Sequence, residues 1–320
     1  MSKRFLTFFA AAFLNHYEKK EKKTKKTSAA ICLVLTFLVV SGSTRASFIL
    51  DGDEQLTIDP PHTNSGRLYD TSQVFIVSGG RAKKIRSYND STVNMSGGRV
   101  RRILSCDNSA TNISGGLVKR FRSYDNSTTD IFGGQVNRFF SHDNSTTDIF
   151  GGQVEKLRFY DYSSVDISGG DIGYDGLYAY NHSSVSISDG NLGSLTACDR
   201  SSVSISGGII SGLDVRNHSS ISISGGIISG LDVRNHSSVT FYGSNFAIDG
   251  TPVGLDEITS ILGGYYAHDP FRILTGTLAN GDIINTQFQI GNDAKIVLIP
   301  EPATLLLLGF GAVMLRRKRS

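Results

Sequence analysis

The sequence contains no tryptophan, six prolines and only three cysteines among its 320 residues. Three cysteines are too few for a disulfide framework. Cys32 lies in an N-terminal apolar run, whereas Cys106 and Cys198 occupy the same position of two repeats that are five repeats apart. If strands stack at their usual spacing of ~4.8 Å, these two thiols are roughly 24 Å apart, far beyond the reach of a disulfide. We therefore expect two single thiols, buried or half-exposed, without a redox role.

A surplus of positive charge is missing from the central part of the chain, although the formal net charge is +3. Nine of the 32 Lys and Arg lie in residues 1–46, and four lie in residues 316–319. The remaining 19 are outnumbered by 26 Asp and Glu within residues 47–300. Because nucleic-acid-binding faces normally carry net positive charge, this balance argues against nucleic acid as a partner of the folded part.

Repetition is what the sequence has in abundance. Residues 203–220 and 221–238 are identical except for Val203 and Ile221. The second glycine of a Ser-Gly-Gly element, or of its variants, recurs every 18 residues with a single 20-residue step, at Gly80, Gly98, Gly116, Gly134, Gly152, Gly170, Gly190, Gly208 and Gly226. A fixed period of this size predicts a solenoid in which each repeat packs on its neighbours.

The apolar residues within one repeat predict which solenoid it is. In residues 200–217 they fall at Val203, Ile205, Ile210, Leu213 and Val215. A spacing of two places a pair on one face of a short strand, and the intervening glycines favour a turn. We therefore expect an all-β fold, a parallel β-helix of 18-residue coils whose core is a column of Val, Ile, Leu and Phe. The uneven spacing favours the right-handed form over the left-handed hexapeptide form.

Residues 1–46 resemble a secretory signal with a long basic n-region. A lysine block at 19–26 precedes the apolar run Ala29–Val40, and a cleavage context at Thr44-Arg45-Ala46 follows. This order predicts recognition by the Sec export machinery and removal of the segment, with an uncleaved anchor as the open alternative. Residues 47–71 are expected to form a first coil and cap, which Asp59-Pro60-Pro61 ends because proline cannot donate to a strand ladder.

The regular period spans residues 72–244 and breaks in residues 245–298. We expect the second segment to cap the last coil, because an open strand edge needs cover; a small ligand-binding module is the alternative. Within it, the pattern predicts a short helix over Leu255–Leu262 and a turn at Asn280-Gly281, with strands over Arg272–Ala279, Ile283–Ile290 and Lys295–Ile299.

The last segment, residues 299–320, has three parts. Pro300-Glu301-Pro302 is followed by the apolar stretch Ala303–Leu315 and then by Arg316, Arg317, Lys318 and Arg319. Thirteen apolar residues are marginal for spanning a membrane, but the basic cluster behind them is typical of a cytoplasmic flank. This order of elements resembles the PEP-CTERM sorting signal of exported proteins. The resemblance implies an exosortase-like processing enzyme, transient retention in the inner membrane through a transmembrane helix, and release to the cell envelope or extracellular matrix.

Two ladders of side chains are candidate sites. The first is acidic or amide-bearing and repeats once per coil, at Asp107, Asp125, Asp143, Asp161 and Asp199, with Asn89, Asn181, Asn217 and Asn235 in the same position. Asp and Asn suit tight turns because they bond to their own backbone and tolerate a left-handed conformation. We expect a structural ladder without a cofactor, and we leave Ca²⁺ between neighbouring carboxylates open.

The second ladder is basic and contains the candidate glycan-binding residues Arg101, Arg102, Lys119 and Arg120, with Tyr124 nearby. Related residues in neighbouring repeats are Lys83, Lys84, Arg138 and Lys156, followed by Arg86, Arg122 and Arg158 and by Tyr88, His142 and Tyr160. One interpretation is a solvated face paired with the acidic ladder. The other is a stripe that holds an acidic polysaccharide, with the aromatic rings stacked on sugars.

Nothing in the sequence indicates a catalytic or metal-binding residue. His182, His218 and His236 share one position, but Arg200 interrupts them, which spoils a metal stack. Enzymes on β-helices grow long loops that wall a cleft, and strict 18-residue coils leave no such loops. We therefore expect an exported, non-enzymatic repeat protein with a structural or adhesive role, and keep a polysaccharide-binding or polysaccharide-cleaving β-helix (a lyase or hydrolase) as the alternative.

Overall fold

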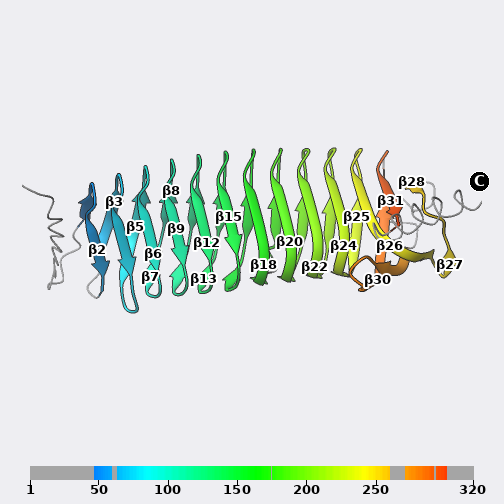
Figure 1. Ribbon diagram of the computed structural model, residues 1–320, viewed down its shortest axis with the longest axis horizontal. Coiled ribbons are helices and arrows are strands. Elements are labelled where there is room, and N and C mark those ends of the chain that lie inside the picture. Colours follow the sequence, from blue (N-terminus) through cyan, green and yellow to red (C-terminus); the bar gives the residue numbers. More distant parts are fainter. Residues whose placement is uncertain (1–46, 60–62, 174, 260–270, 292, 301–320) are drawn as a thin grey trace, which may run out of the picture. The chain divides into compact units, whose positions relative to one another are not determined.

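The computed structural model describes residues 47–59, 63–173, 175–259, 271–291 and 293–300. The chain divides into two units, residues 1–36 and 37–320, and all described residues belong to the second unit. These residues form parallel coils stacked side by side, each pairing with the next (Figure 1). The predicted all-β parallel solenoid is confirmed, while its handedness stays a prediction.

Each coil contributes one strand to each of two long parallel ladders. Ladder 1 contains β1 (Ser47–Leu50), β3 (Thr63–Leu68), β5 (Arg81–Ser87), β8 (Ile103–Ser105), β11 (Phe121–Ser123), β14 (Phe139–Ser141), β17 (Leu157–Phe159), β19 (Leu177–Ala179), β21 (Leu195–Ala197), β23 (Leu213–Val215) and β25 (Gly230–Val233). Ladder 2 contains β2 (Gln55–Ile58), β4 (Gln73–Ile76), β6 (Thr92–Met95), β9 (Ala110–Ile113), β12 (Thr128–Ile131), β15 (Thr146–Ile149), β18 (Ser164–Ile172), β20 (Ser184–Leu192), β22 (Ser202–Ile210), β24 (Ser220–Ile228) and β26 (Ser238–Ile248). These strands make about 11 consecutive coils.

A shorter third ladder closes the coil. It begins at the N-terminal end of β5 and continues through β7 (Arg99–Val100), β10 (Leu117–Val118), β13 (Gln135–Val136) and β16 (Gln153–Val154). In later coils the same positions belong to the C-terminal ends of β18, β20, β22 and β24. Ladders 2 and 3 thus merge into one bent strand in the later coils.

The strand register reproduces the 18-residue period. Ile103 pairs with Phe121, and Phe121 pairs with Phe139. Leu157 pairs with Leu177, which places the 20-residue coil that the glycine spacing predicts. A further irregularity follows Ile76. This residue pairs with Met95, which is 19 residues later in the chain, whereas Arg81 pairs with Arg99, which is 18 residues later. One extra residue therefore lies between Ile76 and Arg81.

The core is the predicted column of apolar side chains that point into the coils. Val100, Val118 and Val136 follow one another in ladder 3, and each is fully buried. Phe121 and Phe139 stack in ladder 1 with their ring centroids 4.7 Å apart, and Phe159 lies edge-on to Phe139 at 6.0 Å. The glycine turns of neighbouring coils pack too closely for a side chain. Gly134 has φ 81°, and a Cβ atom there would lie 2.8 Å from the backbone of Gly115 in the preceding coil.

A column of buried serines closes the turn between ladders 1 and 2, and the sequence analysis did not predict it. Ser127 is fully buried; its Oγ accepts the N–H of Tyr124 at 3.2 Å and donates to the carbonyl of Tyr124 at 2.7 Å. Equivalent buried serines recur in the other coils, at Ser72, Ser91, Ser109, Ser145, Ser163, Ser183, Ser201, Ser219 and Ser237. The serine gives a sharp turn its internal hydrogen bonds in a place without water.

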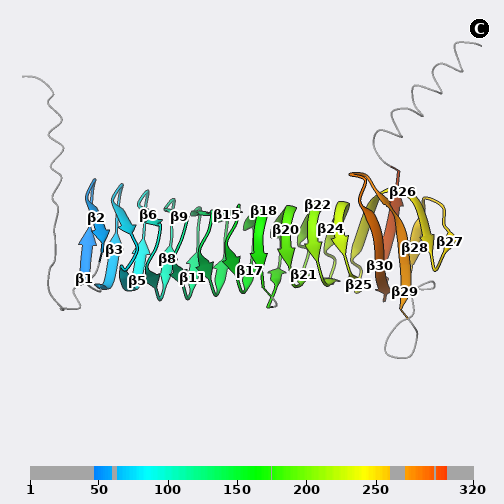
Figure 2. The same ribbon diagram turned by 90° about the horizontal axis from the view of Figure 1, so that it is seen from below.

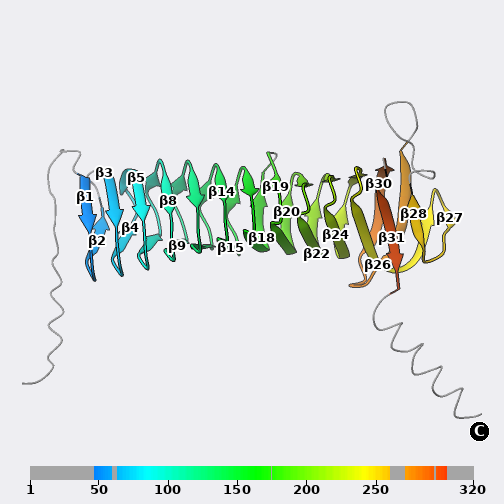
Figure 3. The same cartoon turned by 90° about the horizontal axis from the view of Figure 1, so that it is seen from above.

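The C-terminal segment covers the last coil in a way that the sequence did not indicate. The chain leaves β26 through β27 (Thr251–Pro252) and β28 (Glu257–Thr259), and returns through β29 (Arg272–Leu278), β30 (Ile283–Ile290) and β31 (Lys295–Ile299). Strand β30 then pairs with β25 and β31 with β26, both in parallel, so the two solenoid ladders resume after an interruption (Figures 2 and 3). Their outer edges are covered by the antiparallel strands β29 and β28.

The three strands expected in this segment and the turn at Asn280-Gly281 are confirmed. The helix expected over Leu255–Leu262 is wrong: Glu257–Thr259 is a strand that pairs with β31, and residues 260–262 lie outside the described residues. Three residues that alternate in burial are too short a pattern to separate a strand from one helical turn. In the described part of the chain no helix is long and apolar enough to cross a membrane, and the predicted membrane segment, residues 303–315, lies outside it.

Candidate anion-binding surface

The acidic and amide ladder lies in the turns that lead from ladder 1 to ladder 2. Its residues adopt the left-handed backbone conformation, which Asp and Asn tolerate better than most residue types. The φ angles are 57° at Asp107, 59° at Asp125 and 55° at Asn217. The coils are also tied together through these side chains, because the carboxylate of Asp125 accepts the N–H of Asp107 at 3.1 Å. The predicted turn role is therefore confirmed. Among the described residues no group of three or more His, Cys, Asp and Glu gathers for a metal ion, and Ca²⁺ stays a prediction.

Next to each turn residue lies a second, half-buried row of side chains. Tyr124, His142, Tyr160 and Tyr180 stack ring on ring with centroids 4.7 to 5.1 Å apart. Burial lowers the pKa of His142, which favours its neutral form in this stack. These rings contact each other. The predicted site residues Arg120 and Tyr124 lie at opposite ends of one strand, because β11 (Phe121–Ser123) follows Arg120 and precedes Tyr124.

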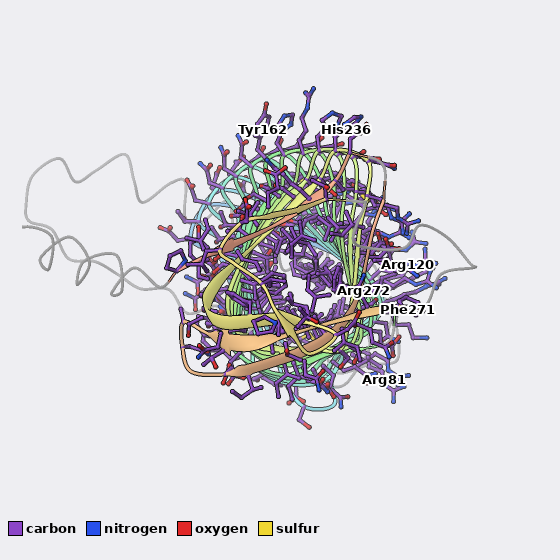
Figure 4. The ribbon with its side chains drawn as sticks, turned by 90° about the vertical axis from the view of Figure 1, so that its right-hand side faces the viewer. Arg81, Arg120, Tyr162, His236, Phe271 and Arg272 are labelled. Atoms are coloured by element: carbon purple, nitrogen blue, oxygen red, sulfur yellow. The ribbon has the colours of Figure 1, made fainter. Side chains whose placement is uncertain are left out.

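The predicted basic residues gather at the corner between ladders 3 and 1. We call this set the cationic corner: Lys83, Lys84, Arg101, Arg102, Lys119, Arg120, Arg138 and Lys156. The backbone stacks them coil on coil, since the N–H of Ile85 donates to the carbonyl of Arg102 at 2.9 Å and that of Ile103 to Arg120 at 2.9 Å. Figure 4, which views the stack end-on, shows Arg120 projecting outward with Arg81 on the same flank, while Tyr162 and His236 project from the turns elsewhere.

The cationic corner is almost without acidic partners. Within the described ranges its only ion pair joins Lys156 to Asp175 at 3.7 Å, and no ion pair links it to the acidic ladder. The nearby carboxylate of Glu155 accepts instead from the amides of Gln135 and Asn137, at 3.1 and 3.0 Å. The expected pairing with the acidic ladder is therefore not seen among the described residues, and the choice between a solvated face and a glycan-binding stripe stays a prediction. Burial, and then the charges of Arg86, Arg102, Arg67 and Arg122, hold the pKa of Lys84 below its usual value.

A row of outward side chains on ladder 1 runs beside this corner. We call it the outer row: Arg67, Arg86, Leu104, Arg122, Phe140, Arg158 and Tyr178, each paired in register with the next. The sequence analysis identified three of its arginines but not the side chains between them. Arg122 and Arg158 lie over the ring of Phe140, each with Cζ 5.8 Å from the ring centroid. Arg158 also lies 5.4 Å from the ring of Tyr178.

Charge changes sign along the stack. Residues 63–160 contain 14 Lys and Arg against eight Asp and Glu, whereas residues 161–244 contain three against eight. In the later coils the outer row continues as Thr196, Asp214 and Asp232, and the two aspartates pair with arginines. Arg234 lies 3.2 Å from Asp214 and 3.0 Å from Asp232. A surplus of positive charge is thus confined to the N-terminal coils, although residues 47–300 as a whole are acidic.

The two cysteines within the described residues, Cys106 and Cys198, lie in the aromatic row of the turns and are free thiols. Cys198 is buried and Cys106 is half-buried, as expected. Burial, together with Asp125, Asp107 and Asp143, raises the pKa of Cys106 to about 11. A thiol with such a pKa is a poor nucleophile at neutral pH because little of it is thiolate.

Residues 298–319 match the PEP-CTERM protein-sorting motif. Neither a curated protein nor a solved structure matches the chain. The matched segment begins inside the fold, since Leu298 is buried in β31 and its N–H donates to the carbonyl of Asp256 at 3.1 Å. Of the predicted sorting residues only Pro300 is described; Glu301, Pro302 and Arg316 to Arg319 lie outside the described residues.

The motif indicates an exported protein that an exosortase-type enzyme processes, with sorting at a membrane before delivery to the envelope or the exterior. Together with the repeat solenoid, it fits a non-enzymatic exported protein.

Proposed function

We propose that the protein is an adhesive and structural element of the cell envelope or extracellular matrix, and that its N-terminal coils hold an anionic polysaccharide along the cationic corner. The observation that carries this proposal is the set of stacked cations, of which only Lys156 has an acidic partner among the described residues. In this view the Sec machinery exports the chain, the C-terminal segment retains it briefly in the inner membrane, and processing releases the solenoid to the polymer outside.

The electrostatics favour a long, linear polyanion. Cations on successive coils repel one another, and this repulsion adds to burial in lowering the pKa of Lys84. A polymer that lies along the stack relieves this repulsion at every coil and releases its own counterions. The cations of the corner repeat once per coil, at the ~4.8 Å spacing of paired strands, so a polymer with a similar spacing of its charges would fit them. Double-stranded DNA carries a charge every ~1.7 Å of its axis, a much denser array.

The test is retention of residues 47–300, which contain every described strand pairing, on immobilised polygalacturonate, with neutral dextran as the control matrix. We expect salt-sensitive retention on polygalacturonate alone. Replacing Arg101, Arg102, Lys119 and Arg120 with Ser should remove most of it and lower the slope of log affinity against log salt by about three, because about 0.7 counterions are released per contact on a single-stranded polyanion.

The matched control is R101K/R102K/R120K, which keeps every charge and should keep the salt slope. Equal retention of the wild type and the Ser variant would overturn the proposal. The same samples, assayed for new reducing ends, test the cleaving alternative, for which binding without product is the expected outcome.

A further inference from the structure

The outer row contains one guanidinium whose surroundings differ from those of every cation in the cationic corner. Arg158 lies against two aromatic rings, those of Phe140 and Tyr178, with Cζ to centroid distances of 5.8 and 5.4 Å. Its Nε is buried and has no hydrogen-bond partner among the described residues. Leaving a buried donor of a charged group unsatisfied is costly, unless a ligand or water accepts from it.

Phe140 positions two guanidiniums at once. It stands between Arg122 and Arg158 in the register of ladder 1, and both contact its ring at 5.8 Å. The attraction of a cation to an aromatic face, and the flat surface of the ring, restrict the rotamers of both arginines before any ligand arrives. Two restricted arginines two coils apart are then separated by roughly 9.6 Å, twice the strand spacing.

From this arrangement we infer that Arg158 and Arg122 form two neighbouring, specificity-determining oxyanion sites, in which Phe140 is the positioning residue and each guanidinium binds one acidic group of a polysaccharide. The inference rests on the proposed function and deepens it. The cationic corner supplies charge, which any polyanion can use. The outer row supplies guanidinium forks, each of which donates hydrogen bonds to the two oxygens of one carboxylate or sulfate in a fixed geometry.

The experiment compares charge-preserving variants of residues 47–300 on polygalacturonate and on dextran sulfate. R158K and R122K keep the charge but remove the fork, and F140L keeps an apolar side chain but removes the ring. R200K is the matched control, because Arg200 is an exposed arginine of the later coils, outside both the cationic corner and the outer row, without a described aromatic contact. Circular dichroism and thermal melting establish that each variant folds.

We expect R158K to weaken binding about tenfold, since hydrogen bonds to charged groups contribute most where the geometry is bidentate. F140L should weaken it about threefold through loss of the cation–aromatic contact. R200K should stay within about twofold of the wild type, and the salt slope of all variants should be unchanged because no charge is lost. Losses on polygalacturonate alone assign a carboxylate, and losses on both polymers assign an oxyanion of either kind.

The inference is overturned if R158K and F140L bind both polymers as tightly as R200K does while folding normally. That outcome leaves the proposed function intact as long as the Ser variant of the cationic corner still loses retention. Absence of binding by the wild type to either polymer would instead contradict the proposed function itself.

Discussion

The N-terminal coils, residues 63–160, and the C-terminal coils, residues 161–244, share one backbone but present different surfaces. In the N-terminal coils the cationic corner is basic and, apart from Lys156, without an ion pair among the described residues, whereas equivalent positions later in the chain are Ser194 and Gly212. The later coils pair two of their three arginines, Arg216 and Arg234, with Asp214 and Asp232. They also expose Ile209 and Ile227, which are 46% and 53% accessible. The inward positions therefore preserve the fold, and the outward positions are free to specialise.

The turns differ between the two regions in one more respect. In the N-terminal coils the N–H of Asn126 donates to Asp107 of the preceding coil at 3.0 Å, whereas Arg200 donates to Asn217 of the following coil at 3.1 Å. This reversal accompanies a second left-handed residue, since Arg200, His218 and His236 have φ between 60° and 68°. Turns of the same length thus adopt two peptide orientations, one in the N-terminal coils and the other in the later coils.

Truncating the core should affect both regions alike and should give the largest effect. Phe139→Ala is expected to cost about 3–5 kcal/mol of unfolding free energy, and Leu195→Ala in a later coil about 2–5 kcal/mol. Both side chains are fully buried in ladder 1. Urea unfolding of residues 47–300 measures the two costs. A cost below about 1 kcal/mol for either would contradict the equivalence of the two cores.

The turns should respond differently. His218→Gly removes the Cβ at φ 65°, where the left-handed conformation costs an L-residue about 1–2 kcal/mol, whereas Asn126→Gly is the matched change at a residue that does not have positive φ. Both variants carry the entropic cost of glycine, so we expect the first to have the higher thermal midpoint. Equal midpoints would mean that the two turn types are not distinct.

Repulsion within ladder 2 gives the smallest of these effects. Asp148 pairs in register with Asp130 and Asp166, whereas the later coils have serines in this row, at Ser186, Ser204 and Ser222. Burial, and then Asp130 and Asp166, raise the pKa of Asp148. The folded state therefore holds the Asp148 proton more tightly, and stability falls as pH rises through that raised pKa.

Asp148→Asn should accordingly stabilise the protein at pH 7 by about 0.2–1 kcal/mol, the range for cross-strand pairs, and should have no such effect below the usual aspartate range. Thermal melting at pH 7 and at pH 3 measures both. A Ser204→Thr variant in the same row of a later coil controls for a change of side chain without a charge. Destabilisation by Asp148→Asn at pH 7 would contradict the expected net cost of a negative charge at this position.

The period, the strands and the turn ladder could be predicted from sequence because they repeat locally. Asp125 in a left-handed turn and the strand Ile283–Ile290 are examples. Pairing between distant segments could not be predicted. Nothing near Ile296 indicates that it faces Val239, and the contact of Phe140 with Arg122 and Arg158 becomes visible only once the register places them in one row. The missing ion pairs of the cationic corner likewise depend on which side chains the coils bring together.

Lysine footprinting tests the central claim most directly. Residues 47–300 contain five lysines: four in the cationic corner, Lys83, Lys84, Lys119 and Lys156, and Lys295 in β31, where it lies 3.1 Å from Glu257. Acetylation is followed by mass spectrometry with and without polygalacturonate. We predict protection of the four corner lysines and no change at Lys295. Equal modification of all five in the presence and absence of the polymer, or protection of Lys295 alone, would contradict the account.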